Sequence, residues 1–395
     1  MNSVLPRSLI ATAVLLALGA SAWLLSVDPA NRSLVFSLLT GAALGIVLQR
    51  SRFCFLCNFR DFVERRDPRG LVGILTALAV GAVLCTAVIM AWAPAPQPGR
   101  LPPNAHIGPV GPVLAIGAFV FGLGMAISGS CLSAHFYRLG EGSPTSPFAL
   151  VGAAAGFLLG FLTWNPLYLW SVSESPATWL PHHLGYAATL GLTLAVVGAL
   201  VLALVAYGRW TRAEPIEPGL PALAKAILRD RWPAAVGGVA VGVISAVYFL
   251  RVAPLGVTAE LGSLVRTQAA ALRIIPESLL GLDTLRGCAT VVKEALLSDN
   301  GLLVVGLVLG SFAAALAAGQ FQPALPSFGQ VARGLSGGVL LGWGAMTSLG
   351  CTIGVLLSGI HAGALSGWVF LVCCAAGAWI GLKLFAAPGA ASRAP

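Results

Sequence analysis

Two cysteines in this chain end the same short pattern of glycine and serine residues. The segments FGLGMAISGSC (121–131) and LGWGAMTSLGC (341–351) align without a gap. Four positions are identical in the alignment: Gly122 and Gly342, Gly124 and Gly344, Ser128 and Ser348, and Cys131 and Cys351. A shared pattern of this length indicates an internal repeat, offset by 220 residues, such as a duplicated chain would have.

The chemistry of a thiol suggests what the repeated cysteines could do. A neutral thiol is a weak hydrogen-bond donor with a polarizable sulfur atom. A lysine or arginine would hold an anion tightly and slow its release, whereas a thiol contact is weak. We therefore expect Cys131 and Cys351 to contact a soft, sulfur-containing anion as neutral thiols. Cysteine can also be a small apolar packing residue, and this is our interpretation of Cys85, Cys373 and Cys374.

A further pair of cysteines lies in LQRSRFCFLCNFRDF (48–62). Cys54 and Cys57 form a C-x-x-C pattern, which is found in redox and zinc sites. No second C-x-x-C or paired histidine completes a zinc site, so we expect no metal. We expect Cys54 to lie at the inner mouth of a pathway, near arginines that attract anions or set the topology: Arg50, Arg52 and Arg60.

The composition indicates which elements must position these residues. Only 9% of the residues are charged, 57% are hydrophobic, and the mean hydropathy is +0.88. So few charges cannot cover a water-soluble surface. The net charge of +9 is not accompanied by basic residues interleaved with aromatic ones, so nucleic-acid binding is not expected.

Apolar runs predict an all-α polytopic membrane protein with about ten transmembrane helices. A helix needs about 20 apolar residues to cross a bilayer. Runs of this kind lie near 8–25, 71–95, 107–130, 147–172, 185–208, 300–320, 330–350 and 363–386, with two shorter ones at 34–49 and 235–250.

Lysine and arginine predict the orientation of these spans. The loops 50–70 and 209–233 are rich in Lys and Arg, whereas loop 96–106 has one Arg and loop 171–184 has neither. With the first two loops in the cytoplasm, ten crossings place both termini there.

The sequence predicts five parts. They are an N-terminal helix (1–33), a first membrane repeat (34–208), a basic cytoplasmic linker (209–234), a second membrane repeat (235–386) and a C-terminal tail (387–395). The first part has features of a cleaved signal peptide, but a retained helix is favoured because another apolar segment follows at once.

In this topology the two copies of the motif cross the membrane in opposite directions. Inverted-topology repeats of this kind place their binding site near the midplane, between broken helices. We expect each cysteine to begin a re-entrant half-helix whose N-terminal N–H groups face an anion. The predicted pathway comprises Cys54, Cys131, Cys351, Ser128, Gly129, Ser130, Ser348, Gly350 and Thr352.

Charged residues near the predicted breaks are few. Glu260 and Asp283 are the candidates for proton coupling, and Arg138 with Glu141 could cap a helix end. Cys288 could serve at the outer side as Cys54 does within, although the sequence assigns no definite role to Cys288 or Cys57.

The chain resembles the YeeE/YedE family of bacterial sulfur-transport membrane proteins. The resemblance rests on QRSRFCF…FRD, GMAISGSCLSAHFYRLGEG, LGVT and GWGAMTSLGCTIGVLLSGIHAGALSGWVF, which together extend from residue 49 to 370. It implies a location in the bacterial inner membrane and a pseudo-two-fold helical fold with re-entrant hairpins. It also implies thiosulfate-pathway cysteines at Cys54, Cys131 and Cys351, and cooperation with a small cytoplasmic TusA-like sulfurtransferase.

These observations favour a transporter of thiosulfate or a related sulfur anion, with neither a cofactor nor enzymatic activity. Three alternatives stay open at this point. The chain could be a membrane sulfur-transfer or redox protein that uses the same cysteines, a transporter of a selenium compound, or a small-anion channel.

Overall fold

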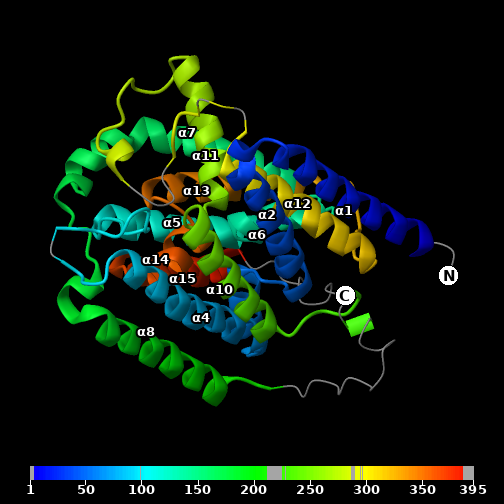
Figure 1. Cartoon of the computed structure of the whole chain (residues 1–395), viewed down its shortest axis with the longest axis horizontal. Helices are drawn as coiled ribbons and strands as arrows, with labels where there is room; N and C mark the ends of the chain where they lie inside the picture. Colours follow the sequence, from blue (N-terminus) through cyan, green and yellow to red (C-terminus); the bar gives the residue numbers. More distant parts are fainter. Residues whose placement is uncertain are drawn as a thin grey trace.

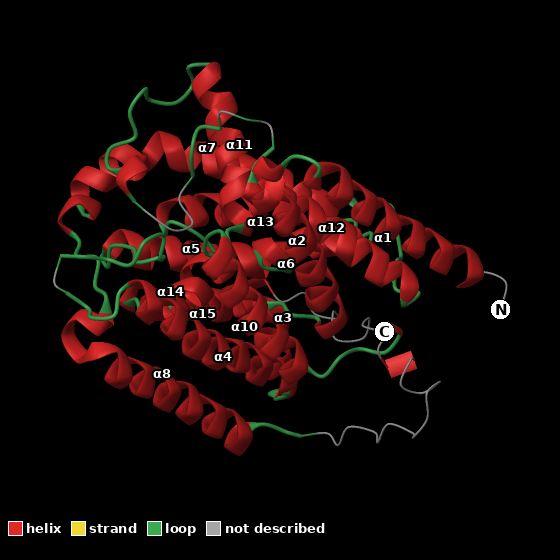
Figure 2. Cartoon of the chain, in the orientation of Figure 1, coloured by secondary structure: helices red, strands yellow, loops and turns green. Residues whose placement is uncertain are grey.

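The structure is a bundle of helices. The computed structural model describes residues 4–97, 99–210, 225–226, 228–285, 290–293, 295 and 297–385. Throughout this part of the chain the regular secondary structure is helical, without a β-strand (Figure 2). The all-α fold class is confirmed.

Ten helices in the described part are long and apolar enough to cross a membrane. They are α1 (Val4–Ser26), α2 (Arg32–Ser51), α4 (Arg69–Trp92), α5 (Pro112–Ser128), α7 (Ser146–Trp170), α8 (Leu180–Tyr207), α10 (Ala234–Arg251), α12 (Asp299–Ala317), α13 (Phe328–Thr347) and α15 (Leu365–Phe385). The chain is a multi-pass membrane protein, as predicted. The two short apolar runs, at 34–49 and 235–250, are complete helices.

Shorter helices lie between the long ones. They are α3 (Phe55–Arg65), α6 (Leu132–Gly140), α11 (Val257–Ala271), the π-helix η4 (Thr352–Leu357) and α14 (Ser358–His361), with 3-10 turns at η1 (Pro29–Asn31), η2 (Val172–Glu174) and η3 (Leu282–Thr284). π-Helices are rare in proteins, and those that occur are often found at functional sites.

Glycines allow the long helices to pack closely. Helix α2 packs on α12, and α7 packs on α13. A β-carbon on Gly41 would lie 2.1 Å from the carbonyl oxygen of Leu303, and one on Gly342 would lie 2.0 Å from that of Ala153. Lipid gives helices no hydrophobic reason to associate, so such close backbone contact is what holds them together.

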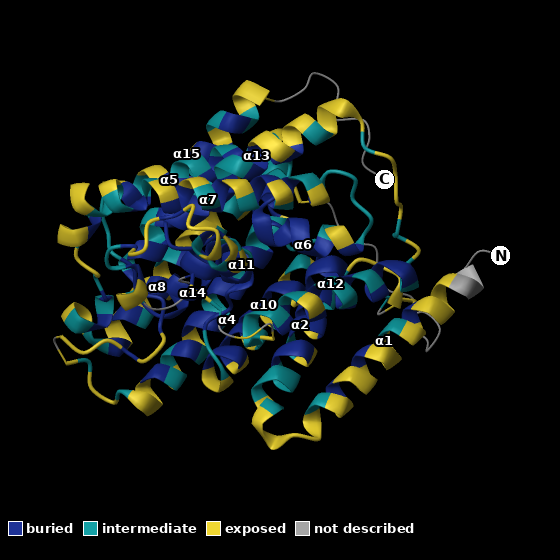
Figure 3. Cartoon of the chain, turned by 90° about the horizontal axis from the view of Figure 1, so that it is seen from above, coloured by how far each residue is buried: buried dark blue, intermediate teal, exposed yellow. Residues whose placement is uncertain are grey.

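The most extensive helix contacts join segments that are far apart in the sequence. They are the contacts of α2 with α12, α4 with α10, α5 with α13 and α15, and α7 with α13. Helix α1 packs on α12, and α8 packs on α4. Figure 1 shows α1 and α8 on opposite flanks of the bundle, and Figure 3 shows exposed residues along much of α1.

The two loops that are rich in Lys and Arg, 50–70 and 209–233, meet at one end of the bundle, called the basic end here. There the amide of Trp232 donates to the carbonyl of Arg50, and the amide of Arg209 donates to the carbonyl of Arg66. At the opposite end α5 begins and α7 ends, and the amide of Val110 donates to the carbonyl of Pro176. The C-terminal half of the predicted linker is anchored to α2, whereas residues 211–224 and 227 lie outside the described part.

Candidate functional site

The three cysteines of the predicted pathway each precede a short helix. Cys54 lies directly before α3, Cys131 before α6 and Cys351 before η4, all three in extended backbone conformation. Helix α5 ends at Ser128, and α13 ends one residue before its counterpart, Ser348. The predicted helix breaks are therefore present at both copies of the motif.

The thiols of these cysteines lie together in the interior. The Sγ of Cys54 is 4.0 Å from that of Cys131 and 3.9 Å from the hydroxyl of Ser130. The hydroxyl of Ser133, in the first turn of α6, lies 3.6 Å from the Sγ of Cys351. All three cysteines are at least 97% buried. Segments separated by some 300 residues of sequence thus bring sulfur atoms and hydroxyls into one cluster.

A small cavity, called the thiol cavity here, lies beside this cluster. Its polar lining comes from Cys131, Ser133 and Thr352. The rest of the lining is apolar: Phe53, Phe55, Ile74, Ile353, Leu356 and Leu357. Among the described residues, this lining contains neither lysine nor arginine, so the polar side chains that an ion would meet here are one thiol and two hydroxyls.

The serine of each motif closes the turn at the helix break. The hydroxyl of Ser128 donates to the carbonyl of Ser130 at 3.1 Å, and that of Ser348 donates to the carbonyl of Gly350 at 3.2 Å. Gly129 has φ +86°, and Gly350 has φ +148°. These four residues shape the breaks through the backbone.

The basic side of the thiol cluster holds a cation that the sequence did not assign to the pathway. Nη1 of Arg138 donates to the hydroxyl of Ser130 at 2.8 Å. Glu141, which we expected as a partner of Arg138 in a helix cap, accepts instead from Gln49. The position of Arg138, two turns after Cys131 on α6, was the one signal that could have identified it.

The three arginines of the predicted inner mouth occupy different environments. Arg50 is 98% buried, and its Nη2 donates to the carbonyl of Asp230, while Nε and Nη1 have no hydrogen-bond partner among the described residues. Arg52 and Arg60 are partly exposed. Arg52 and Arg60 can act on ions in solution, whereas Arg50 is covered by residues 230–232.

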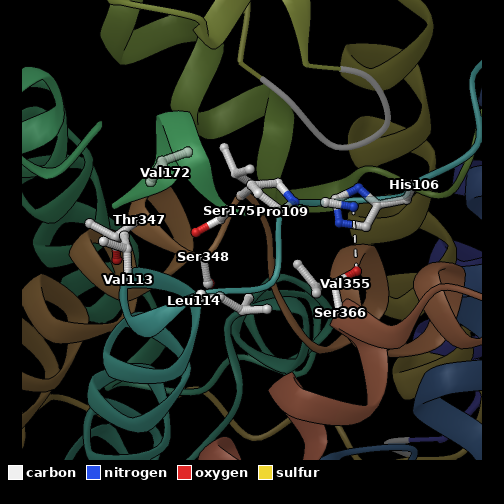
Figure 4. A pocket seen from close by; sticks show the side chains of 13 residues that line it. His106, Pro109, Val113, Leu114, Val172, Ser175, Thr347, Ser348, Val355 and Ser366 are labelled. Carbon is white, nitrogen blue, oxygen red and sulfur yellow. Dashed lines mark hydrogen bonds between the residues drawn. The ribbon is translucent and has the colours of Figure 1, made fainter. Parts of the chain in front are cut away.

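At the opposite end, a cavity reaches the second copy of the motif. It is called the serine cavity here, and its polar side chains come from His106, Ser175, Thr347, Ser348 and Ser366 (Figure 4). The amide of Gly108 donates to Ser366. Burial lowers the pKa of His106 to about 4, so its ring is neutral at physiological pH. The cavity therefore offers hydroxyls and a neutral imidazole.

A second cavity at this end lies between α7, α11 and α13. It is called the threonine cavity, and Phe157, Thr258, Thr290, Leu349 and Gly350 belong to its lining. Within the described residues, Gly256 directly precedes α11, as Cys54 precedes α3. The proposed role of Cys288 falls on a residue outside the described part.

The two carboxylates considered for proton coupling are in ion pairs. Glu260 pairs with Lys293 and accepts from the hydroxyl of Ser298 at 2.9 Å. Asp283 lies 2.7 Å from Nη2 of Arg266. Each of the two carboxylates thus already has a basic side chain as its partner.

Comparison with known proteins places this arrangement in a family. The family model described as "Sulphur transport" matches residues 50–380, which include all three pathway cysteines. The chain belongs to the sulphur-transport family. The resemblance to YeeE/YedE proteins is thereby confirmed.

Two relatives of this sulphur-transport protein match over most of their length. The thiosulfate transporter TsuA of Escherichia coli (strain K12) is 28% identical over 348 residues, or 87% of this chain and 92% of that one. TsuA of Spirochaeta thermophila is 30% identical, over 87% and 96% of the two chains. The probable transporter YedE of Salmonella typhimurium is 31% identical over 90 residues, 22% of each chain.

Proposed function

We propose that this family member transports thiosulfate, or a related sulfur-containing anion, across the inner membrane of a bacterium. The observation that carries the proposal is the cluster of thiols at the helix breaks, where Cys54 contacts Cys131 and Ser133 links to Cys351. The names of the two TsuA relatives support the choice of anion.

The pathway passes the anion from thiol to thiol without a covalent intermediate. The order is the serine cavity, then Cys351, the thiol cavity with Cys131, and finally Cys54 at the basic end. Weak S–H donors suit a polarizable sulfur atom and release it quickly. The first N–H groups of α6, which have no partner within the helix, add positive potential beside Cys131.

In our proposal the pathway lies between two inverted repeats. The paired contacts of α2 with α12 and of α4 with α10 support a two-fold arrangement. Helix α1 packs on α12 and α8 packs on α4, so α1 and α8 are equivalent in this scheme. We therefore place the division between the repeats after α7, with five spans in each half. The boundary expected from the sequence was at residue 208. The short helices α6 and η4–α14 are then the re-entrant segments.

The basic end faces the cytoplasm in this scheme, with both termini on that side. Importing a dianion against 100 mV costs about 4.6 kcal/mol, at about 2.3 for each charge. Because Glu260 and Asp283 are in ion pairs, we propose that a TusA-like sulfurtransferase at the basic end consumes the anion and so drives its uptake.

A membrane sulfur-transfer or redox protein is the second candidate function. The 4.0 Å between the sulfur atoms of Cys54 and Cys131 favours it, because sulfur exchange requires neighbouring sulfur atoms. Substitution by serine distinguishes the two functions. A hydroxyl still donates a hydrogen bond to an anion, so a transporter keeps part of its activity, whereas a carrier of persulfide keeps none.

Uptake of radiolabelled thiosulfate into proteoliposomes tests the proposal. We expect saturable uptake by the unchanged protein, which Cys131→Ala and Cys351→Ala each abolish and which sulfate does not compete. Cys373→Ala is the matched control, since Cys373 lies on α15 outside the thiol cluster, and it should transport normally. Equal uptake by all four proteins would remove the thiols from the pathway. Absence of uptake by the unchanged protein would contradict thiosulfate as the substrate. Direct uptake of labelled selenite and sulfite would then be measured.

A further inference from the structure

The backbone of Leu349 is in the left-handed region, where leucine is rarely found. Its φ is +61°, and the equivalent residue in the first motif, Gly129, has φ +86°. Both breaks therefore require this conformation directly after the motif serine. A β-carbon in this region crowds the backbone, so glycine is the residue expected there. The second copy instead has a leucine, at a cost in free energy.

Lack of space does not explain the glycine in the first copy. A β-carbon on Gly129 would meet no atom within 4 Å. The difference between the two copies therefore lies in what the leucine side chain does at position 349. Residues held in strained conformations by the surrounding structure cluster at functional sites.

Leu349 is shared by the serine cavity and the threonine cavity. Among the described residues, it is the one that the two linings have in common. It is 7% exposed, and Cys351, two residues later, is fully buried. An apolar residue that belongs to both linings thus lies two positions before the first thiol of the proposed pathway.

We propose that the side chain of Leu349 is the apolar barrier that controls which solutes pass from the cavities of the opposite end to Cys351. Its strained backbone lies beside Gly350, with φ +148°, so the 349–350 segment has another conformation readily available. Movement of this segment relieves the strain and withdraws the side chain from the path. The first copy, with Gly129 at this position, has no corresponding barrier in front of Cys131.

Leu349 has this role only if the pathway proposed above is correct, whereas access to Cys351 can be measured without knowing the substrate. The test is the rate at which a sulfonated maleimide modifies Cys351 in the purified full-length protein, followed by peptide mass spectrometry. We expect Leu349→Ala and Leu349→Gly to accelerate this reaction at least tenfold. Leu349→Met, which keeps an apolar side chain of similar volume, should stay within twofold of the unchanged protein.

Two controls separate an opened barrier from a loosened fold. The rate at Cys54, at the basic end, should be the same in every variant. Leu341→Ala removes an equally buried leucine of α13 that lines neither cavity, and it should leave the rate at Cys351 unchanged. Leu349→Gly relieves the backbone strain and keeps the test valid if Leu349→Ala fails to fold. The proposed barrier would be contradicted if Leu349→Gly left the rate of Cys351 modification unchanged, or if Leu341→Ala raised that rate equally.

Discussion

Arg138 brings a positive charge to the basic side of the thiol cluster. Arg138 donates to Ser130, whose hydroxyl lies 3.9 Å from the Sγ of Cys54. An anion that leaves Cys54 therefore meets a hydroxyl already oriented by a guanidinium. The second motif has Ser358 at the equivalent position, so the two copies of the motif differ in charge there.

Replacing this arginine should slow transport. A hydrogen bond to a charged group contributes about 1.5–3 kcal/mol. We expect Arg138→Gln to lower kcat/KM for thiosulfate uptake by about tenfold or more, and Arg138→Lys to recover part of it, as measured from initial rates in proteoliposomes. Arg69→Gln is the control, because Arg69 pairs with Asp67 at the surface. Similar rates for Arg138→Gln and Arg69→Gln would assign Arg138 to structure alone.

His106 should make the stability of the protein depend on pH. Burial lowers its pKa to about 4, from 6.5 in the unfolded chain. The unfolded chain therefore binds the proton more tightly, so the stability is complete above pH 6.5 and falls between pH 6.5 and 4, by at most about 3 kcal/mol. We expect thermal unfolding in detergent at pH 7.5, 5.5 and 4.5 to show this loss. His106→Gln should make this loss smaller without abolishing it, because His135 and His361 are buried as well. Parallel profiles would mean that His106 does not contribute.

At the scale of elements, helix α13 makes close contact with α7 through glycine. A β-carbon on Gly342 would lie 2.0 Å from the carbonyl oxygen of Ala153, and one on Gly156 would lie 2.1 Å from that of Val339. The neighbouring atoms belong to backbone, which cannot move aside as a flexible side chain does. The spacing of α7 and α13, and with it the position of the second break, depends on these glycines.

Adding one methyl group at this contact should destabilise the protein. We expect Gly342→Ala to lower the free energy of unfolding by about 1–3 kcal/mol, as overpacking does. Gly191→Ala, on α8, is the matched control, because a β-carbon there would meet no atom within 4 Å. It should be neutral or slightly stabilising, since alanine favours a helix over glycine. The measurement is thermal unfolding in detergent, and equal midpoints for the two variants would contradict the packing argument.

The ten long helices and both helix breaks were predictable from the sequence, and the reason is physical. A span in lipid needs a continuous apolar run, and a break needs glycine or a similarly permissive residue. The contact of Arg138 with Ser130 and the shared position of Leu349 between two cavities were not predictable. Both depend on which faces of separate helices meet, and apolar runs with glycine on several faces leave that undetermined.

For the whole molecule, the orientation in the membrane is the property most open to a direct test. The basic end carries Arg50, Arg66, Arg209 and Arg231 at contacts between chain segments. If this end faces the cytoplasm, alkaline phosphatase fused after Ser175 should be active in the periplasm, and a fusion after Arg209 should be inactive. The reverse pattern would place the thiol of Cys54 on the external side and invert the proposed direction of transport.

The pairing of helices has a consequence for how the protein is made. Each extensive interface joins a helix that precedes α8 to one that follows it: α2 with α12, α4 with α10, α5 with α13 and α15, and α7 with α13. As the ribosome inserts the first helices, their glycine faces have no native partner and remain against lipid until the second half is synthesised. Assembly is therefore late and nearly simultaneous across the molecule, so a chain that stops after α7 should be a substrate for membrane proteases rather than a half-transporter.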